Sequence, residues 1–212
     1  MRFRRDDAEF DRAIGFVDAT YALALTLLVT TLDIDDAPAA FADLGSLSDA
    51  IGAQFIAFVI AFMVIANYWL EHHRMIATWT AIDTPTIVAN LFLVAAIVLL
   101  PFSTQSVGDP AVEALALPTV IMAINVAAAS ILHTWVFSIG VRRGLLAESR
   151  PRAEVRGYVI LGLLPAAVFC ASVPVAVLVS AETGRAVWLT LVVIGPLAHR
   201  TVRRSVARQS AG

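Results

Sequence analysis

The sequence predicts an all-α integral membrane protein with six transmembrane helices in each chain. Three observations favour this fold. Of the 212 residues, 59% are hydrophobic and 15% are charged, whereas a water-soluble fold is about half apolar. The apolar residues fall in runs of roughly 20, the length that crosses about 30 Å of hydrocarbon. The arginines gather beside alternate ends of these runs, as they do in cytoplasmic loops.

The apolar runs follow one another within a single domain that spans residues 1–212. A tail of about residues 1–11 mixes Arg with acidic residues and has no cleavage site of small residues, so we expect the first helix to remain in the protein. An Arg-rich tail of about 200–212 follows the last run. We expect the six spans near residues 13–32, 48–70, 84–105, 112–141, 156–180 and 185–200.

The basic residues predict the orientation of these spans. Fourteen of the 15 arginines fall on one side if both termini are cytoplasmic, and only Arg185 falls on the other. The opposite loops are acidic and hold Asp33, Asp35, Asp36, Asp43, Asp49, Asp109, Glu113 and Glu182. Such a rim concentrates cations, although a solvated outer loop explains it as well.

The first span carries a carboxylate, Asp18, next to the hydrocarbon. An unpaired charge there costs a few kcal/mol, on the order of 3, so Asp18 is a candidate functional residue that needs a partner. Donors expected near the same membrane boundary are Arg12, Trp69, His72, His73 and Asn90. A network that clamps the first three spans together is the preferred interpretation, and a proton relay is the alternative.

A second face of the first span combines leucine with threonine. At 100° per residue, Phe16, Thr20, Leu23, Leu27 and Thr30 share one stripe, with Thr26 at its edge. The stripe can face lipid, pack on another helix, or line an axis in a symmetric oligomer. Threonine hydroxyls can supply oxygens to a cation, and rings of leucine can gate a pore by dewetting.

Signals for other functions are weak. His72 and His73 diverge by 100° on a helix, and no further His or Cys cluster completes a metal site. His133 and His199 are isolated, which favours packing or boundary positions. No phosphate loop or nucleophile elbow occurs, so we expect neither an enzyme, nor a cofactor, nor a nucleic-acid partner.

Three segments resemble the endosomal and lysosomal potassium channel family, also called the transmembrane protein 175 family. Arg12, Phe16 and Asp18 match its first-helix signature, with Val17 in place of a serine. Tyr68, Trp69, His72 and His73 are similar to the end of its second helix. Residues 90–105, NLFLVAAIVLLPFSTQ, are similar to its third helix.

The resemblance implies a passive, potassium-preferring channel in a bacterial plasma membrane, without a carbonyl filter loop. It implies a homotetramer in which the first helix of each chain lines a central pore. Leu23 would form the constriction, and Thr26, Leu27 and Thr30 would line the path. Arg12, Phe16, Asp18, Trp69, His72, His73 and Asn90 would hold the helix in place. A proton-coupled transporter or proton pathway through Asp18 and the histidines is the alternative, and a membrane scaffold is a third class.

Overall fold

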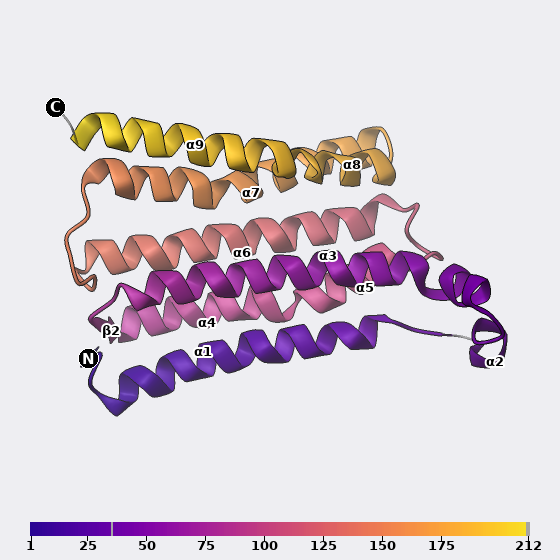
Figure 1. Ribbon diagram of the computed structural model, residues 1–212, viewed down its shortest axis with the longest axis horizontal. Helices are drawn as coiled ribbons and strands as arrows, with labels where there is room; N and C mark the ends of the chain where they lie inside the picture. The colour runs from indigo at the N-terminus through magenta and orange to yellow at the C-terminus, as the bar shows by residue number, and fades with distance from the viewer. Residues whose placement is uncertain (35, 211–212) are drawn as a thin grey trace.

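The computed structural model describes residues 1–34 and 36–210, with side chains up to residue 202. Long helices lie side by side in one bundle, as predicted (Figure 1). The arginines at 203, 204 and 208, and Asp35, lie outside the described side chains. The main helices are α1 (Ala8–Leu27), α3 (Leu44–Ala77), α4 (Thr84–Val98), α5 (Leu100–Gly108), α6 (Ala116–Arg142), α7 (Arg152–Leu178), α8 (Ala181–Trp188) and α9 (Thr190–Ser210).

Five helical segments of the described chain are long and apolar enough to cross a membrane. They are Ala8–Thr31, Leu44–Ala77, Thr84–Gly108, Ala116–Arg142 and Arg152–Leu178. These segments correspond to the first five predicted spans, with ends shifted by several residues. The largest difference is at α3, which continues seven residues beyond the predicted end at residue 70. The chain is therefore a multi-pass membrane protein.

The sixth predicted span, 185–200, is divided between two helices. α8 ends at Trp188, and α9 begins at Thr190 and runs back along α7 towards the end of the bundle where α1 starts (Figure 1). The apolar stretch here is bounded by Arg185 and Arg200, which leaves it shorter than the first five. A sixth membrane crossing therefore stays a prediction.

The third span is also divided. α4 and α5 meet at Leu99, and Pro101 lies in the first turn of α5. Proline has no backbone N–H and cannot continue the hydrogen-bond ladder of α4. At its other end α4 begins with a capping box, in which Asp83 accepts a hydrogen bond from the Thr86 backbone N–H at 3.1 Å.

The N-terminal segment, expected to be a tail, folds onto the bundle. Strand β1 (Arg2–Arg4) pairs antiparallel with β2 (Ala81–Asp83), with Phe3 opposite Ile82. The Arg5 guanidinium donates to the carbonyl oxygens of Ile76, Ala77 and Trp79 at 3.3, 3.0 and 2.9 Å. These carbonyls lie at or just beyond the end of α3, where helices leave acceptors without internal donors. The start of α1 is thereby fastened to the loop between α3 and α4.

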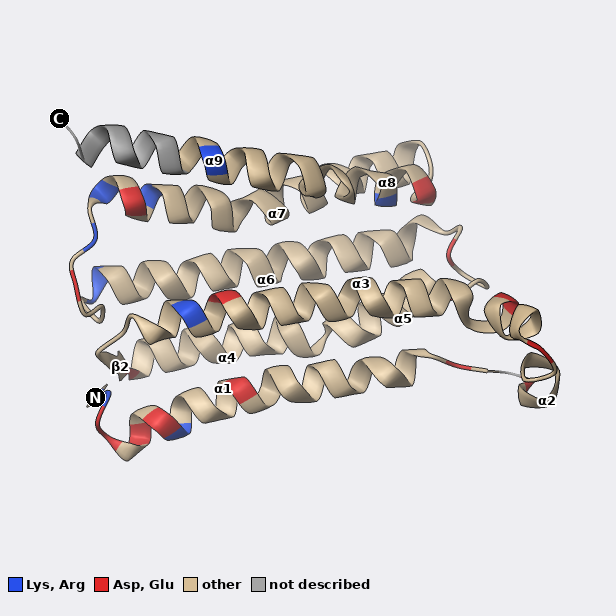
Figure 2. Cartoon of the chain, viewed as in Figure 1, with Lys and Arg blue, Asp and Glu red and all other residues tan. Residues whose placement is uncertain are grey.

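The two ends of the bundle differ in charge, as the distribution of arginines and acidic residues in the sequence predicts. Arginines gather at the end where α1 begins, and acidic residues dominate the other end, where Arg185 is the one basic residue among the described side chains (Figure 2). A short helix, α2 (Ala37–Ala40), and the 3-10 turn η1 (Leu28–Thr31) lie in the acidic half. Successive spans run in opposite directions, so the span ends that carry the arginines lie at one end of the bundle. This is the pattern that the positive-inside rule describes.

Candidate functional site

Helix α1 has two sharply different faces. Val17, Tyr21, Ala24 and Leu28 are buried against the bundle. On the other face Phe16 is 57% exposed, Leu23 56% and Leu27 37%. The predicted stripe therefore lies on the side of α1 that the chain itself leaves uncovered. A single chain does not supply a partner for this apolar surface.

The threonines on this face donate their hydroxyl hydrogens to backbone carbonyls of the same helical segment. Thr20 Oγ1 donates to the Phe16 carbonyl oxygen at 2.8 Å, Thr26 Oγ1 to that of Leu23 at 2.8 Å, and Thr30 Oγ1 to that of Leu27 at 2.7 Å. A hydroxyl that donates to its own helix keeps its oxygen lone pairs free as acceptors. Thr26 and Thr30 are exposed and Thr20 is half-buried. The face therefore presents leucine methyls and acceptor oxygens.

Asp18 lies on a different side of α1 and is held by α3. Trp69 Nε1 donates a hydrogen bond to Asp18 Oδ1 at 3.1 Å, and the Trp69 indole lies 5.5 Å from the ring of His73. Asp18 is half-buried. Of the five partners expected for Asp18, Trp69 is the one that makes this contact.

His72 and Asn90 form a separate, buried pair. His72 Nε2 and Asn90 Oδ1 are 2.8 Å apart, and Asn90 also donates from Nδ2 to the Thr86 carbonyl oxygen at 2.8 Å. This pair joins α3 to α4. His72 and His73 line one cavity of about 330 Å³ together with Asp18. The first turns of α1, the end of α3 and Arg5 form the rest of its wall.

Two members of the expected network lie elsewhere. Arg12 is exposed, and Phe16 belongs to the exposed face described above. Within the described side chains neither one contacts Asp18 by a hydrogen bond or an ion pair. Val17, which stands in the place of the family's serine, is buried. The hydrogen bond that holds Asp18 therefore comes from α3, and α1 also packs against α4.

Sequence reasoning did not connect three further residues to the site, namely the buried Tyr21 and His133 and the half-buried Tyr158. The ring of Tyr21 lies 5.8 Å from that of His72, His72 lies 6.2 Å from His133, and His133 lies 6.4 Å from Tyr158. This series crosses from α1 to α7. His133 looked isolated because its neighbours are distant in sequence, and no pattern within α6 indicates them.

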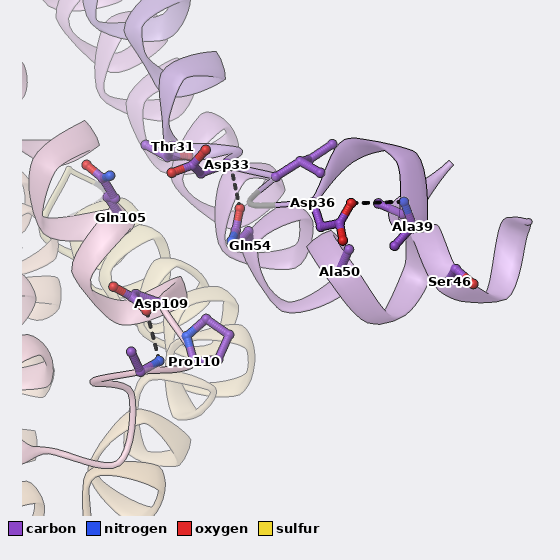
Figure 3. A pocket seen from close by; sticks show the side chains of 13 residues that line it. Thr31, Asp33, Asp36, Ala39, Ser46, Ala50, Gln54, Gln105, Asp109 and Pro110 are labelled. Carbon is purple, nitrogen blue, oxygen red and sulfur yellow. Dashed lines mark hydrogen bonds between the residues drawn. The ribbon is translucent and has the colours of Figure 1, made fainter. Parts of the chain in front are cut away.

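A cavity of about 690 Å³ opens at the acidic end of the bundle. It is lined by Asp33, Asp36, Asp109, Gln54 and Gln105, among others (Figure 3). Local roles account for two of these carboxylates, because Asp36 accepts from the Ala39 N–H and Asp109 from the Ala111 N–H. Asp43 likewise caps α3, and hydrogen bonds from Ser46 hold its pKa below the usual value. Helix and turn capping therefore explain Asp36, Asp43 and Asp109 of the acidic rim.

Comparison with known proteins identifies relatives of about half of the chain. A family model described as endosomal/lysosomal potassium channel TMEM175 matches residues 12–101, from Arg12 in α1 to Pro101 in α5. The resemblance inferred from the sequence is confirmed over this segment. A potassium channel from Streptomyces collinus is 28% identical over 104 residues, 48% of each chain. A potassium channel from Chryseobacterium is 27% identical over 97 residues, 46% of this chain and 48% of that one. The match thus covers about half the length of these curated relatives.

Solved structures extend the similarity to nearly the whole fold. The crystal structure of a lysosomal potassium-selective channel TMEM175 homolog from Chamaesiphon minutus superposes with a TM-score of 0.72. It covers 90% of this chain and 98% of that one at 18% identity. The crystal structure of a variant of the potassium channel MtTMEM175, in complex with a nanobody fusion, superposes with a TM-score of 0.65. It covers 91% of this chain and 93% of that one at 17% identity. The chain therefore has the fold of these proteins over a much larger share of its length than the family model matches.

Proposed function

We propose that the chain is a potassium-preferring cation channel of the TMEM175 family in a bacterial plasma membrane. Four copies assemble so that α1 of each one lines a central pore. Potassium flows passively, and no backbone-carbonyl filter takes part. The observation that carries this proposal is the uncovered face of α1 and the following turn η1, which bears Leu23, Thr26 and Leu27 on α1 and Thr30 on η1.

The two faces of α1 suit a helix beside an axis. The buried face joins α1 to its own subunit, while the uncovered face remains available to the same face of other copies. Rotational symmetry turns each exposed residue into a ring. A ring of Leu23 forms an apolar constriction, and the acceptor oxygens of Thr26 and Thr30 offer partial coordination to a dehydrated cation on its far side.

Measurement of ion currents after Leu23→Ala tests the proposal. Truncation of the narrowest ring should widen the pore, so we expect a larger single-channel conductance in planar bilayers and a smaller preference for potassium over sodium. Leu163→Ala is the matched control, because Leu163 is a partly exposed leucine on α7, away from α1. Unchanged conductance in Leu23→Ala, with normal assembly, would contradict a constriction at this position.

The alternative is a proton pathway through Asp18 and the α3 histidines, which share one cavity. Asp18→Asn separates the two functions. Asparagine keeps an oxygen that can accept from Trp69, but it cannot carry a proton. A channel should retain potassium flux in liposomes without obligatory proton counterflow, whereas a protein that lost only proton coupling would support the alternative.

A further inference from the structure

A groove of about 730 Å³ lies between the start of α7 and the described part of α9. Its lining combines two arginines with apolar side chains, among them Arg152, Arg156, Ile160, Ile194, Leu197 and Ala198. Because α9 runs back along α7, the arginines belong to the basic end of the bundle, and Ile160 and Ile194 lie farther along the helices (Figure 1). The groove is therefore charged at the membrane boundary and apolar towards the hydrocarbon.

Arg152 and Arg156 lie on the same side of α7. They are four residues apart, a spacing that places side chains on one helix face. Glu154 lies between them in sequence but lines a different cavity, beside the α6–α7 connection with Glu148 and Arg150. Among the described side chains, neither Arg152 nor Arg156 forms an ion pair. Their positive charge is therefore available to an anion in the groove.

The apolar part of the groove is open to the surroundings of the bundle. Ile160, Ile194 and Leu197 are all exposed, and α7 and α9 lie on the opposite side of the bundle from α1 (Figure 1). Exposed aliphatic side chains along membrane-embedded helices are natural contacts for an acyl chain. Arginine at the cytoplasmic boundary is a natural contact for a phosphate, since its planar guanidinium can donate two parallel hydrogen bonds.

We propose that this groove binds one anionic phospholipid. Its phosphate lies between Arg152 and Arg156, and one acyl chain follows Ile160, Ile194 and Leu197. The charge complementarity of a basic pocket between helices at the cytoplasmic boundary supports this occupant. The inference goes beyond the proposed function, because it requires that α7 and α9 both lie in the membrane and does not depend on what α1 conducts.

Native mass spectrometry of the detergent-solubilised full chain tests the site. The probes are palmitoyl-oleoyl phosphatidylglycerol and the zwitterionic phosphatidylcholine with the same chains. The wild type should retain the anionic lipid preferentially. Arg152→Gln combined with Arg156→Gln should lower its retention by roughly tenfold or more, since two charge contacts are lost.

The matched control is Arg142→Gln combined with Arg150→Gln. It removes the same charge from the same end of the bundle, but neither residue lines the groove. We expect this control to keep the lipid preference. An equal loss in both double variants would show general attraction to positive charge and would overturn the proposal. Arg152→Lys with Arg156→Lys keeps the charges and should keep most of the preference, which guards against a folding defect.

A variant that fills the groove distinguishes a lipid from free phosphate. Ala198→Phe leaves both arginines in place but occupies space needed by the acyl chain, so retention of the lipid should fall. Inorganic phosphate should not displace the lipid. Displacement by phosphate together with an unchanged Ala198→Phe would overturn the lipid assignment. A change in subunit number in the variants would instead indicate a second copy in the groove. Potassium flux measured on the same preparations keeps failure of this inference separate from failure of the channel proposal.

Discussion

Trp69 Nε1 donates a hydrogen bond to Asp18 Oδ1 at 3.1 Å and so joins α3 to α1. Hydrogen bonds to charged groups contribute about 1.5–3 kcal/mol. Trp69→Phe should therefore lower the unfolding free energy of the detergent-solubilised protein by about that amount. Thermal unfolding measures the effect, and Trp135→Phe on an exposed part of α6 is the control. Equal destabilisation by the two variants would contradict a specific role for the Asp18 contact.

Arg5 should matter far more than its neighbour Arg4. The Arg5 guanidinium donates to three carbonyl oxygens near the end of α3, whereas Arg4 forms an ion pair with Asp6 in which both side chains are 79% exposed. Exposed ion pairs contribute little, about 0–1 kcal/mol. Hydrogen exchange of the backbone amides in β1 and β2 should accelerate in Arg5→Gln and stay nearly unchanged in Arg4→Gln. The reverse order would show that Arg5 does not hold this end of the bundle.

The Asp83 carboxylate should stabilise the loops in a pH-dependent way. Burial by itself would raise the pKa of Asp83, but hydrogen bonds from Thr86 and Arg143 outweigh it and lower the pKa below the ordinary 3.8. A lowered pKa in the folded state gives stability that is complete above the ordinary value and is lost as the pH falls through the folded value.

Asp83→Asn is the variant that tests this pH dependence. We expect wild type to be more stable at neutral pH, by about 1 kcal/mol or more. The difference should shrink as the pH is lowered past 3.8 and the wild-type carboxylate becomes protonated. The melting temperatures of wild type and Asp83→Asn at neutral pH and at a pH below 3.8 measure this difference in stability. A difference that stays constant down to strongly acidic pH would contradict a contribution from the ionised carboxylate.

Tyr68 and Tyr158, whose hydroxyl groups are both buried, should respond differently to loss of those hydroxyls. Tyr68 Oη lies 2.6 Å from Ser130 Oγ and donates to the Val126 carbonyl oxygen at 3.2 Å, but Tyr158 Oη has no hydrogen-bond partner in the described part of the chain. Tyr68→Phe should destabilise the protein by about 1 kcal/mol. Tyr158→Phe should be neutral or stabilising, because it removes an unpartnered polar group. Unfolding of both variants in parallel provides the comparison.

Features that depend on short stretches of sequence were predictable. The first five spans follow from runs of apolar residues, because membrane thickness sets the length of a crossing helix. The grouping of arginines at one end follows from the same count of spans. The helical period alone also places Phe16, Leu23 and Leu27 on one face of α1, whereas the exposure of that face became known only from the structure. Residues 185–200 show the limit of this reasoning, because a break at Leu189 divides the apolar run.

Only the tertiary structure decided which distant residues meet. The amino-acid sequence offered five donors for Asp18. The tertiary structure selected Trp69 by bringing α3 against α1, paired His72 of α3 with Asn90 of α4, and left Arg12 exposed. It also paired β1 with β2 and brought His133 between His72 and Tyr158. Periodicity determines which residues share one face of one helix. Rotation and approach of neighbouring helices determine which faces touch, and these depend on packing across the whole bundle.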